Sequence, residues 1–190
     1  MTVWDTIIEH IVSKHLAYSR FNVRAPYNDL ILDSFIQRHQ HHIIFERKLK
    51  LVQMRTGLIW QETMGNVKGV KNLGVGHESG LDLLGDDTFH NGEFCMELKN
   101  SYRTDNHSAR RSNILKLAKY ARENPGVRPV YGFVNDSTRE GSKVLRLDPE
   151  TGVEILFISG RQLLYWMFGD EYDIVIKHIT KHVNAHLEFV

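Results

Sequence analysis

The chain has 190 residues, of which 42% are hydrophobic and 25% charged, and its formal net charge is +1. This length fits one domain with a buried core, and the composition is that of a globular protein without repeats or low-complexity tracts. A single cysteine, Cys95, excludes an intrachain disulfide and a cysteine-rich zinc site. Because the net charge is close to zero, any nucleic-acid surface must be local.

The first 57 residues are predicted to be mainly helical. One segment repeats apolar residues at helical spacing, at Ile7, Ile8, Ile11 and Val12. Asn28 is placed to cap a second helix, and a third runs from residue 43 to Gly57, since glycine commonly follows a helix C-terminus. The N-terminal sequence lacks the layout of a secretory signal, and no apolar run approaches bilayer length. We therefore expect a soluble, cytoplasmic protein with no membrane partner.

A strand–loop–hairpin arrangement is predicted for residues 58–100. Residues 58–63 read as a short strand, and residues 65–80 as a glycine-rich mobile loop. Strands at 80–85 and 93–100 then form a hairpin around a turn that contains Asn91-Gly92. A turn centred near residue 89 or 90 would place Asp82 opposite Glu97. A tight turn at Asn91-Gly92 would shift the pairing by about two positions per strand.

The remaining segments complete an α/β pattern. A helix at 109–122, a strand at 130–134, a hairpin at 144–147 and 153–158, and helices at 160–168 and 171–187 follow. We expect the helix at 109–122 to face inward through Ile114, Leu115, Leu117, Ala118 and Ala121. The order predicts a mixed β-sheet flanked by helices, with helical N- and C-terminal segments. We expect the chain to form one domain, 1–190, that has a helical part (1–57, a candidate dimerisation part), a catalytic core (58–135) and a C-terminal part (136–190).

Three charged residues in the predicted hairpin carry the chemistry. Side chains alternate along a strand, so Glu97 and Lys99 project together while Phe94, Met96 and Leu98 face the core. Asp82 begins an otherwise apolar strand, where a charge is costly without a partner. Two carboxylates suit a hard divalent cation, and a lysine beside them suits a developing negative charge. The bland alternative is a surface strand with a weak Glu–Lys pair.

The pattern Asp82…Glu97-Leu98-Lys99 resembles the signature of the PD-(D/E)XK nuclease superfamily, and within it small type II restriction endonucleases. The resemblance covers about residues 45–135, although Leu81 stands where the motif name has proline. It implies a restriction-endonuclease-like fold, Mg²⁺ as cofactor, Asp82 and Glu97 as metal ligands, and Lys99 as the catalytic lysine. It also implies a further upstream acid, for which Glu78 and Glu62 are the candidates.

A polar, basic segment follows the lysine and is the candidate DNA-binding region. Its side chains suit base edges and phosphates. The candidates there are Arg103, Asn106, His107, Arg110 and Arg111. Lys68 and Lys71 in the glycine-rich loop are further candidates for phosphate contacts. The alternatives are a polar connecting loop and a solvated helix face.

We therefore expect a Mg²⁺-dependent site-specific endonuclease of the restriction–modification type. It would hydrolyse double-stranded DNA at a short site as a homodimer, because two-fold DNA sites are matched by two-fold proteins. Alternatives are a repair or junction-resolving nuclease of the same superfamily, a non-catalytic DNA-binding module, and a structural domain with no nucleic-acid partner. The glycine-rich loop lacks the Lys and Ser/Thr of a phosphate-binding loop, so no nucleotide cofactor is expected.

Histidines offer a separate metal hypothesis. The cluster His39-Gln-His41-His42 and the pair His178/His182, four residues apart on a helix, have spacings that zinc sites use. The sequence around them offers no cysteine or acid, which favours surface histidines.

Overall fold

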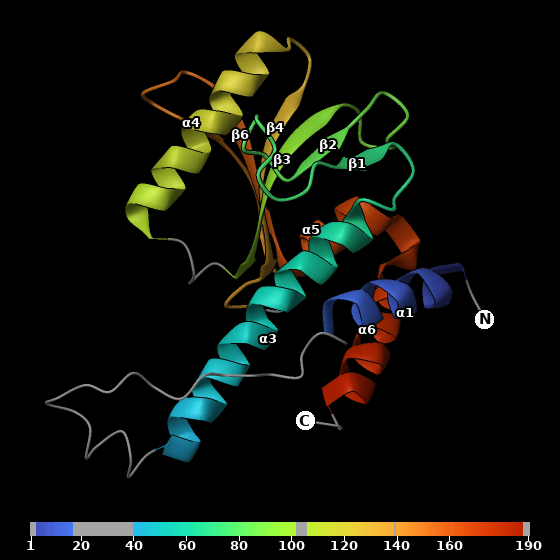
Figure 1. The fold of residues 1–190 in the computed structure, drawn as a ribbon. Helices are drawn as coiled ribbons and strands as arrows, with labels where there is room; N and C mark the ends of the chain where they lie inside the picture. The colour runs from blue at the N-terminus through green and yellow to red at the C-terminus, as the bar shows by residue number, and fades with distance from the viewer. Residues whose placement is uncertain (1–2, 17–39, 102–105, 139, 188–190) are drawn as a thin grey trace, which may run out of the picture.

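A computed structural model of the protein describes residues 3–16, 40–101, 106–138 and 140–187 (Figure 1). The predicted helix after Asn28 lies outside these residues. The elements in chain order are α1 (Val3–Leu16), α3 (Gln40–Met64), β1 (Val70–Asn72), β2 (Leu83–Gly85), β3 (Phe94–Ser101), α4 (His107–Glu123), β4 (Arg128–Asn135), β5 (Lys143–Leu147), β6 (Glu154–Ser159), α5 (Gly160–Phe168), η2 (Gly169–Glu171) and α6 (Tyr172–Leu187).

The strands form one six-stranded mixed sheet in the order β1-β2-β3-β4-β6-β5. The central pairs β3–β4 and β4–β6 are parallel, and the outer pairs are antiparallel. Parallel strands need a crossover connection, and α4 supplies it between β3 and β4. The predicted α/β fold, with a mixed sheet flanked by helices and helical N- and C-terminal segments, is confirmed.

Helices cover both faces of the sheet (Figure 1). On one face, Leu117 of α4 packs with Cys95 and Tyr131. On the other, α3 and α5 bury Ile59 and Leu163 against the sheet. α1 and α6 lie side by side and contact α3 and α5, respectively. The sheet is therefore the middle layer, and each β3 side chain points to one helical layer or the other.

The apolar face of α1 is used within the chain. Ile8, Ile11 and Val12 are almost completely buried, and Val175 and Ile179 of α6 belong to the same core cluster. The burial of this face accounts for the helical spacing of apolar residues in the N-terminal segment. In α1, the candidate dimerisation part thus packs its apolar side on the C-terminal helix.

Two sequence predictions around residue 60 are wrong. Gly57 lies inside α3, and the predicted strand 58–63 is the last part of that helix. Ile59, Trp60 and Met64 are buried against the core, so tertiary packing extends the helix past the glycine. The glycine-rich segment is also more ordered than predicted, because it contains β1, which pairs with β2.

The inward face of α4 is partly mispredicted. Leu117 and Ala118 are buried as expected, but Leu115 is 45% exposed and Asn113 is buried. A polar side chain therefore occupies a core-facing position, directed at the same sheet face as Glu97.

Gly57→Ala should raise the free energy of unfolding by about 0.5–1 kcal/mol, because alanine loses less conformational entropy than glycine inside a helix. A Cβ at Gly57 would lie 3.6 Å from Cβ of Asn100, an ordinary contact. Urea denaturation measures the change. Gly85→Ala is the contrasting control: its Cβ would overlap the ring of buried Phe94, so it should destabilise by about 1–3 kcal/mol. Destabilisation by Gly57→Ala would show that the helix ends there.

Candidate active site

The hairpin brings Asp82 next to Glu97. β2 and β3 pair with Leu83 opposite Met96, which centres the turn between residues 89 and 90. Asp82 lies one position before this ladder and Glu97 one position after it, which agrees with the first of the two registers that the sequence allows. The two carboxylates are close enough for the charge of Glu97 to raise the pKa of Asp82. The backbone amide of Asp82 donates to the carbonyl oxygen of Met96 at 3.0 Å, which fixes this end of the hairpin.

Glu97 is the buried acid of the site. It points to the α4 face, as the alternation of β3 predicts, and is 5% exposed. Its Oε1 accepts a hydrogen bond from Nζ of Lys99, two residues along the same face. Its Oε2 is buried and has no hydrogen-bond partner among the described residues. A buried carboxylate oxygen without a donor is costly, and a bound cation would satisfy it.

The Asp82 carboxylate is held by the backbone of β3. Its Oδ2 accepts a hydrogen bond from the amide of Leu98 at 2.7 Å. Burial, followed by the negative charge of Glu97, raises the pKa of Asp82 to about 6. The Leu98 hydrogen bond and the charges of Lys99 and Lys116 oppose this rise. Two acids that share a partly buried site resist ionising together, which is the condition a divalent cation relieves.

A second lysine, on α4, faces the site and was not among the predicted catalytic residues. A Cβ at Gly80 would lie 3.2 Å from Cδ and Cε of Lys116, so the loop before Asp82 packs closely on this side chain. Nζ of Lys116 donates to Oδ1 of Asn113 at 3.4 Å, and Nδ2 of Asn113 donates to the hydroxyl of Tyr131 at 3.2 Å. Tyr131 is the register neighbour of Glu97 on β4. The i, i+3 spacing of Asn113 and Lys116 was the available sequence signal.

The two candidates for a further acidic ligand have different surroundings. Glu78 is exposed and lines a cleft of about 620 Å³ together with Gly80 and Lys116. Glu62 accepts hydrogen bonds from Nζ of Lys14 at 2.8 Å and Nε2 of His15 at 2.7 Å. Its carboxylate therefore joins α3 to α1. Glu78 therefore lies near Gly80, in the loop that precedes Asp82, whereas Glu62 is engaged in the contact between α3 and α1.

The predicted DNA-binding residues of α4 have distinct environments, and Arg103 lies outside the described residues. Oδ1 of Asn106 caps α4 by accepting from the amide of Ala109 at 2.8 Å. His107 is exposed in the first turn of α4. The guanidinium of Arg111 pairs with Asp148 at 2.5 Å and Glu150 at 2.6 Å. The Arg111 side chain thus ties α4 to the β5–β6 turn.

Arg110 lies at the lysine end of the site. Its guanidinium carbon is 6.0 Å from the ring centre of Phe133 and 5.5 Å from that of Phe157. Phe133 is the register partner of Lys99 on β4. Cation–π contacts of this kind help to orient a guanidinium.

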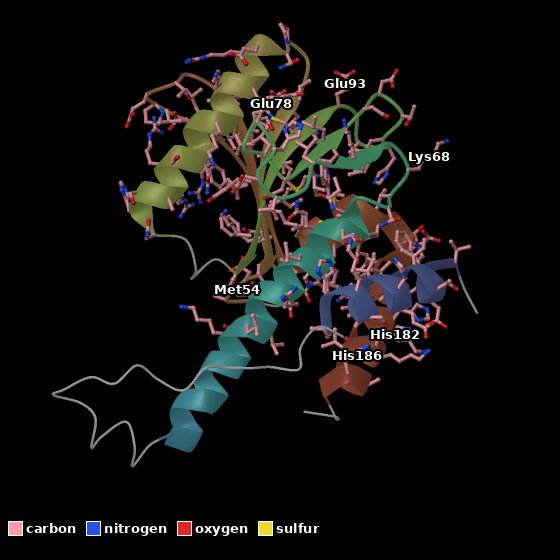
Figure 2. All side chains as sticks on the ribbon, viewed as in Figure 1. Met54, Lys68, Glu78, Glu93, His182 and His186 are labelled. Carbon is pink, nitrogen blue, oxygen red and sulfur yellow. The ribbon has the colours of Figure 1, made fainter. Side chains whose placement is uncertain are left out.

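The two lysines of the glycine-rich segment lie elsewhere. Lys71 is exposed on the edge strand β1, and Lys68 is exposed just before that strand. Figure 2 shows Lys68 at the outer side of the sheet, apart from Glu78 near α4. The structure thus does not group Lys68 with the residues of α4.

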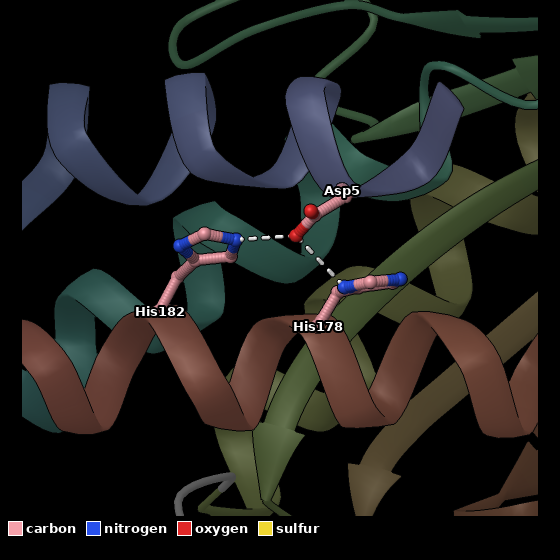
Figure 3. A group of neighbouring side chains, drawn as sticks. All are labelled: Asp5, His178 and His182. Atoms are coloured by element: carbon pink, nitrogen blue, oxygen red, sulfur yellow. Dashed lines mark hydrogen bonds and ion pairs between the residues drawn. The ribbon is translucent and has the colours of Figure 1, made fainter. Parts of the chain in front are cut away.

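A second group of side chains of the types that can bind metals lies between α1 and α6, outside the sheet. The sequence around His178 and His182 offers no acid, and surface positions were predicted for both. In the structure, Asp5 of α1 contacts both rings, and His182 is buried (Figure 3). The expectation that no acid accompanies these histidines is therefore wrong, because the acid comes from the other end of the chain.

Comparisons with known proteins give no family. No protein-family model matches this chain, and a search of curated proteins finds no significant similarity. Among the described residues, no helix is both long and apolar enough to cross a membrane. Function must therefore be inferred from the geometry of the site itself.

In the metal-free protein, the free energy of unfolding should fall between about pH 4 and pH 7 relative to Asp82→Asn, by on the order of 1–3 kcal/mol. The pKa of Asp82 is raised to about 6 in the folded state. A raised carboxyl pKa contributes stability below the unfolded value near 4, and that stability is lost as pH rises through 6. Urea denaturation in EDTA measures the difference. Asp87→Asn, an exposed acid of the same hairpin, serves as control, and a pH-independent difference would show that Asp82 titrates normally.

Proposed function

We propose that the protein is a Mg²⁺-dependent DNA endonuclease whose catalytic residues are Asp82, Glu97 and Lys99. The observation that carries this proposal is the buried Oε2 of Glu97, which has no hydrogen-bond partner among the described residues and lies near the Asp82 carboxylate, whose pKa is raised to about 6. Asp82 and Glu97 would hold the ion, because Mg²⁺ prefers oxygen ligands and commonly binds through one or two carboxylates. When bound, Mg²⁺ would neutralise charge on the phosphate and lower the pKa of a coordinated water.

The residues of the chain divide the remaining work. Glu97 holds the ammonium of Lys99 on the α4 face, so the positive charge is already oriented before DNA binds. Lys99 is 28% exposed at its side chain, whereas that of Glu97 is 6% exposed, so the lysine is the member that can reach a phosphate. It would stabilise the negative charge that develops on the phosphoryl oxygens. The positive charge of Lys116, on α4, favours the ionised form of Asp82 and so reduces the electrostatic repulsion between the two carboxylates.

The finer proposal is a type II restriction endonuclease that cuts both strands of a short site. It rests on the resemblance of Asp82…Glu97-Leu98-Lys99 to that family and on one such site per chain. Cleavage of two strands related by a two-fold axis then requires two chains, which supports a homodimer. The restriction-endonuclease-like fold and double-stranded DNA as partner belong to the same proposal.

Each of Asp82→Ala, Glu97→Ala and Lys99→Ala should lower the rate of DNA cleavage by at least about 100-fold, because each removes a ligand or a charge that acts on the phosphate. The measurement is digestion of a plasmid of known sequence with and without Mg²⁺. Discrete fragments from the wild type, in Mg²⁺ only, would support the site-specific enzyme.

Lys119→Ala is the matched control, since this α4 lysine is 76% exposed and pairs only loosely with Glu123 at 3.9 Å. It should cleave like the wild type. A smear of products, or preferential cleavage of branched DNA, would favour the repair or junction-resolving nuclease. Binding of DNA without cleavage, unchanged in Lys99→Ala, would favour the non-catalytic module and contradict the proposal.

Substitutions of Arg110 and Arg111 should have different effects, one on DNA binding and the other on stability. Arg110→Ala should weaken DNA binding and reduce its dependence on salt, because its guanidinium is fixed on aromatic rings beside Lys99 and would bind phosphate. Arg111→Ala should chiefly lower the free energy of unfolding, through its lost ion pairs with Asp148 and Glu150. Filter binding at several salt concentrations and urea denaturation measure the two effects. Equal losses of DNA affinity would show that both arginines contact DNA.

A further inference from the structure

Asp5, His178 and His182 converge at the interface of α1 and α6 (Figure 3). Oδ1 of Asp5 lies 2.9 Å from Nδ1 of His178 and 2.8 Å from Nε2 of His182. The three ligand atoms all lie within 4.8 Å of one another. Small side-chain rotations would let one ion contact all three, since bonds from zinc to these atoms are about 2 Å long.

The local structure explains why these side chains meet. His178 and His182 are four residues apart on α6, so they project from one face, one turn above the other. Asp5 lies in the first turn of α1 and is 7% exposed. Ile8 of α1 and Val175 of α6, three residues along their helices from Asp5 and His178, belong to the same buried apolar cluster. An acid placed among apolar side chains is costly unless cations or donors surround it.

The Asp5 carboxylate is in the ionised form that binds metal ions. Hydrogen bonds from His182 and then Lys181 lower the pKa of Asp5 to about 2, so it is ionised at neutral pH. Neutral imidazole is the form of histidine that binds metals. Nζ of Lys181 also reaches Oδ1 of Asp5, at 3.1 Å, but that side chain is 60% exposed and can turn to solvent. A metal ion would replace its charge.

We propose that Asp5, His178 and His182 bind a Zn²⁺ ion that joins α1 to α6. Two imidazole nitrogens and one carboxylate oxygen suit zinc, whereas Mg²⁺ prefers oxygen ligands alone. This site is separate from the carboxylates of the sheet and does not depend on the nuclease proposal. The alternative for the same residues is an ion-pair cluster in which Lys181 and protonated histidines neutralise Asp5.

The test uses the full chain without a histidine tag, carrying Glu97→Gln so that the sheet carboxylates contribute no tight site. After treatment with a chelator, Zn²⁺ is titrated by calorimetry, and Co²⁺ is added as a spectroscopic substitute. We expect one tightly bound Zn²⁺ per chain and the visible absorption of tetrahedral Co²⁺. Zn²⁺ should also raise the Tm, and Mg²⁺ should not, because only an ion that binds the folded state stabilises it.

Single variants assign the ion to this interface. His182→Ala and Asp5→Asn should each weaken Zn²⁺ binding by at least about 100-fold, since even residues that support a metal ligand contribute 10–100-fold. His10→Ala removes an exposed histidine of α1 and should bind Zn²⁺ like the parent. Lys181→Ala should bind Zn²⁺ at least as tightly, because its ammonium competes with the ion.

The same experiments can overturn the proposal. A chain that binds neither Zn²⁺ nor Co²⁺, or His182→Ala that binds Zn²⁺ like the parent, would leave only the ion-pair cluster. If His182→Ala fails to fold, X-ray absorption of the zinc-loaded parent decides, and a zinc shell with fewer than two imidazoles contradicts the assignment. DNA cleavage is not a readout, so this failure is distinct from failure of the nuclease proposal.

Discussion

The buried carboxylate of Glu97 is the constraint on which the candidate site depends. β3 directs Phe94 and Met96 to one helical layer and Glu97 to the other, so one strand builds both the core and the site. An acid this deeply buried needs compensating charge or donors. Lys99 provides one contact, and the nearby amide of Leu98 is already used by Asp82. Among the described residues, one oxygen of Glu97 is left without a hydrogen-bond partner, and α4 faces the site with Lys116 rather than with apolar side chains alone.

Local pattern was enough to predict the parts of the site that lie within one hairpin. Alternation along β3 indicated which face carries Glu97 and Lys99, and the hairpin limited Asp82 to two registers. By contrast, the helix–strand choice at residues 58–63 could not be made from sequence. A short apolar run after Gly57 fits either structure, and only packing of Ile59 and Met64 on the sheet decides it. Strand β1 was also not predicted, because the glycines around it are typical of a loop. Its pairing with β2, a contact that local sequence does not reveal, stabilises it as a strand.

Contacts between distant segments account for what the sequence did not reveal. Lys116 reaches the site because α4 folds back over β3, and Arg111 is engaged by acids of the β5–β6 turn. His178 and His182 lacked an acidic neighbour in sequence, and Asp5 supplies one from the opposite end of the chain. Spacing within a helix indicates which side chains share a face, but the partner of that face is a property of the tertiary structure.

The joining of α1 to α6 also sets an order of events in folding. Asp5 and His182 are separated by 177 positions. At ribosomal rates of about 5–20 residues per second, α1 is made roughly 10–35 seconds before its partner helix. Throughout that interval its apolar face, with Asp5 in the first turn, can pack on α3 but not yet on α6, the two described helices that contact it most. Of these two helices, the earlier one therefore completes its packing only after the later one is made, and Asp5 disfavours burial of α1 in any apolar surface that lacks the two histidines.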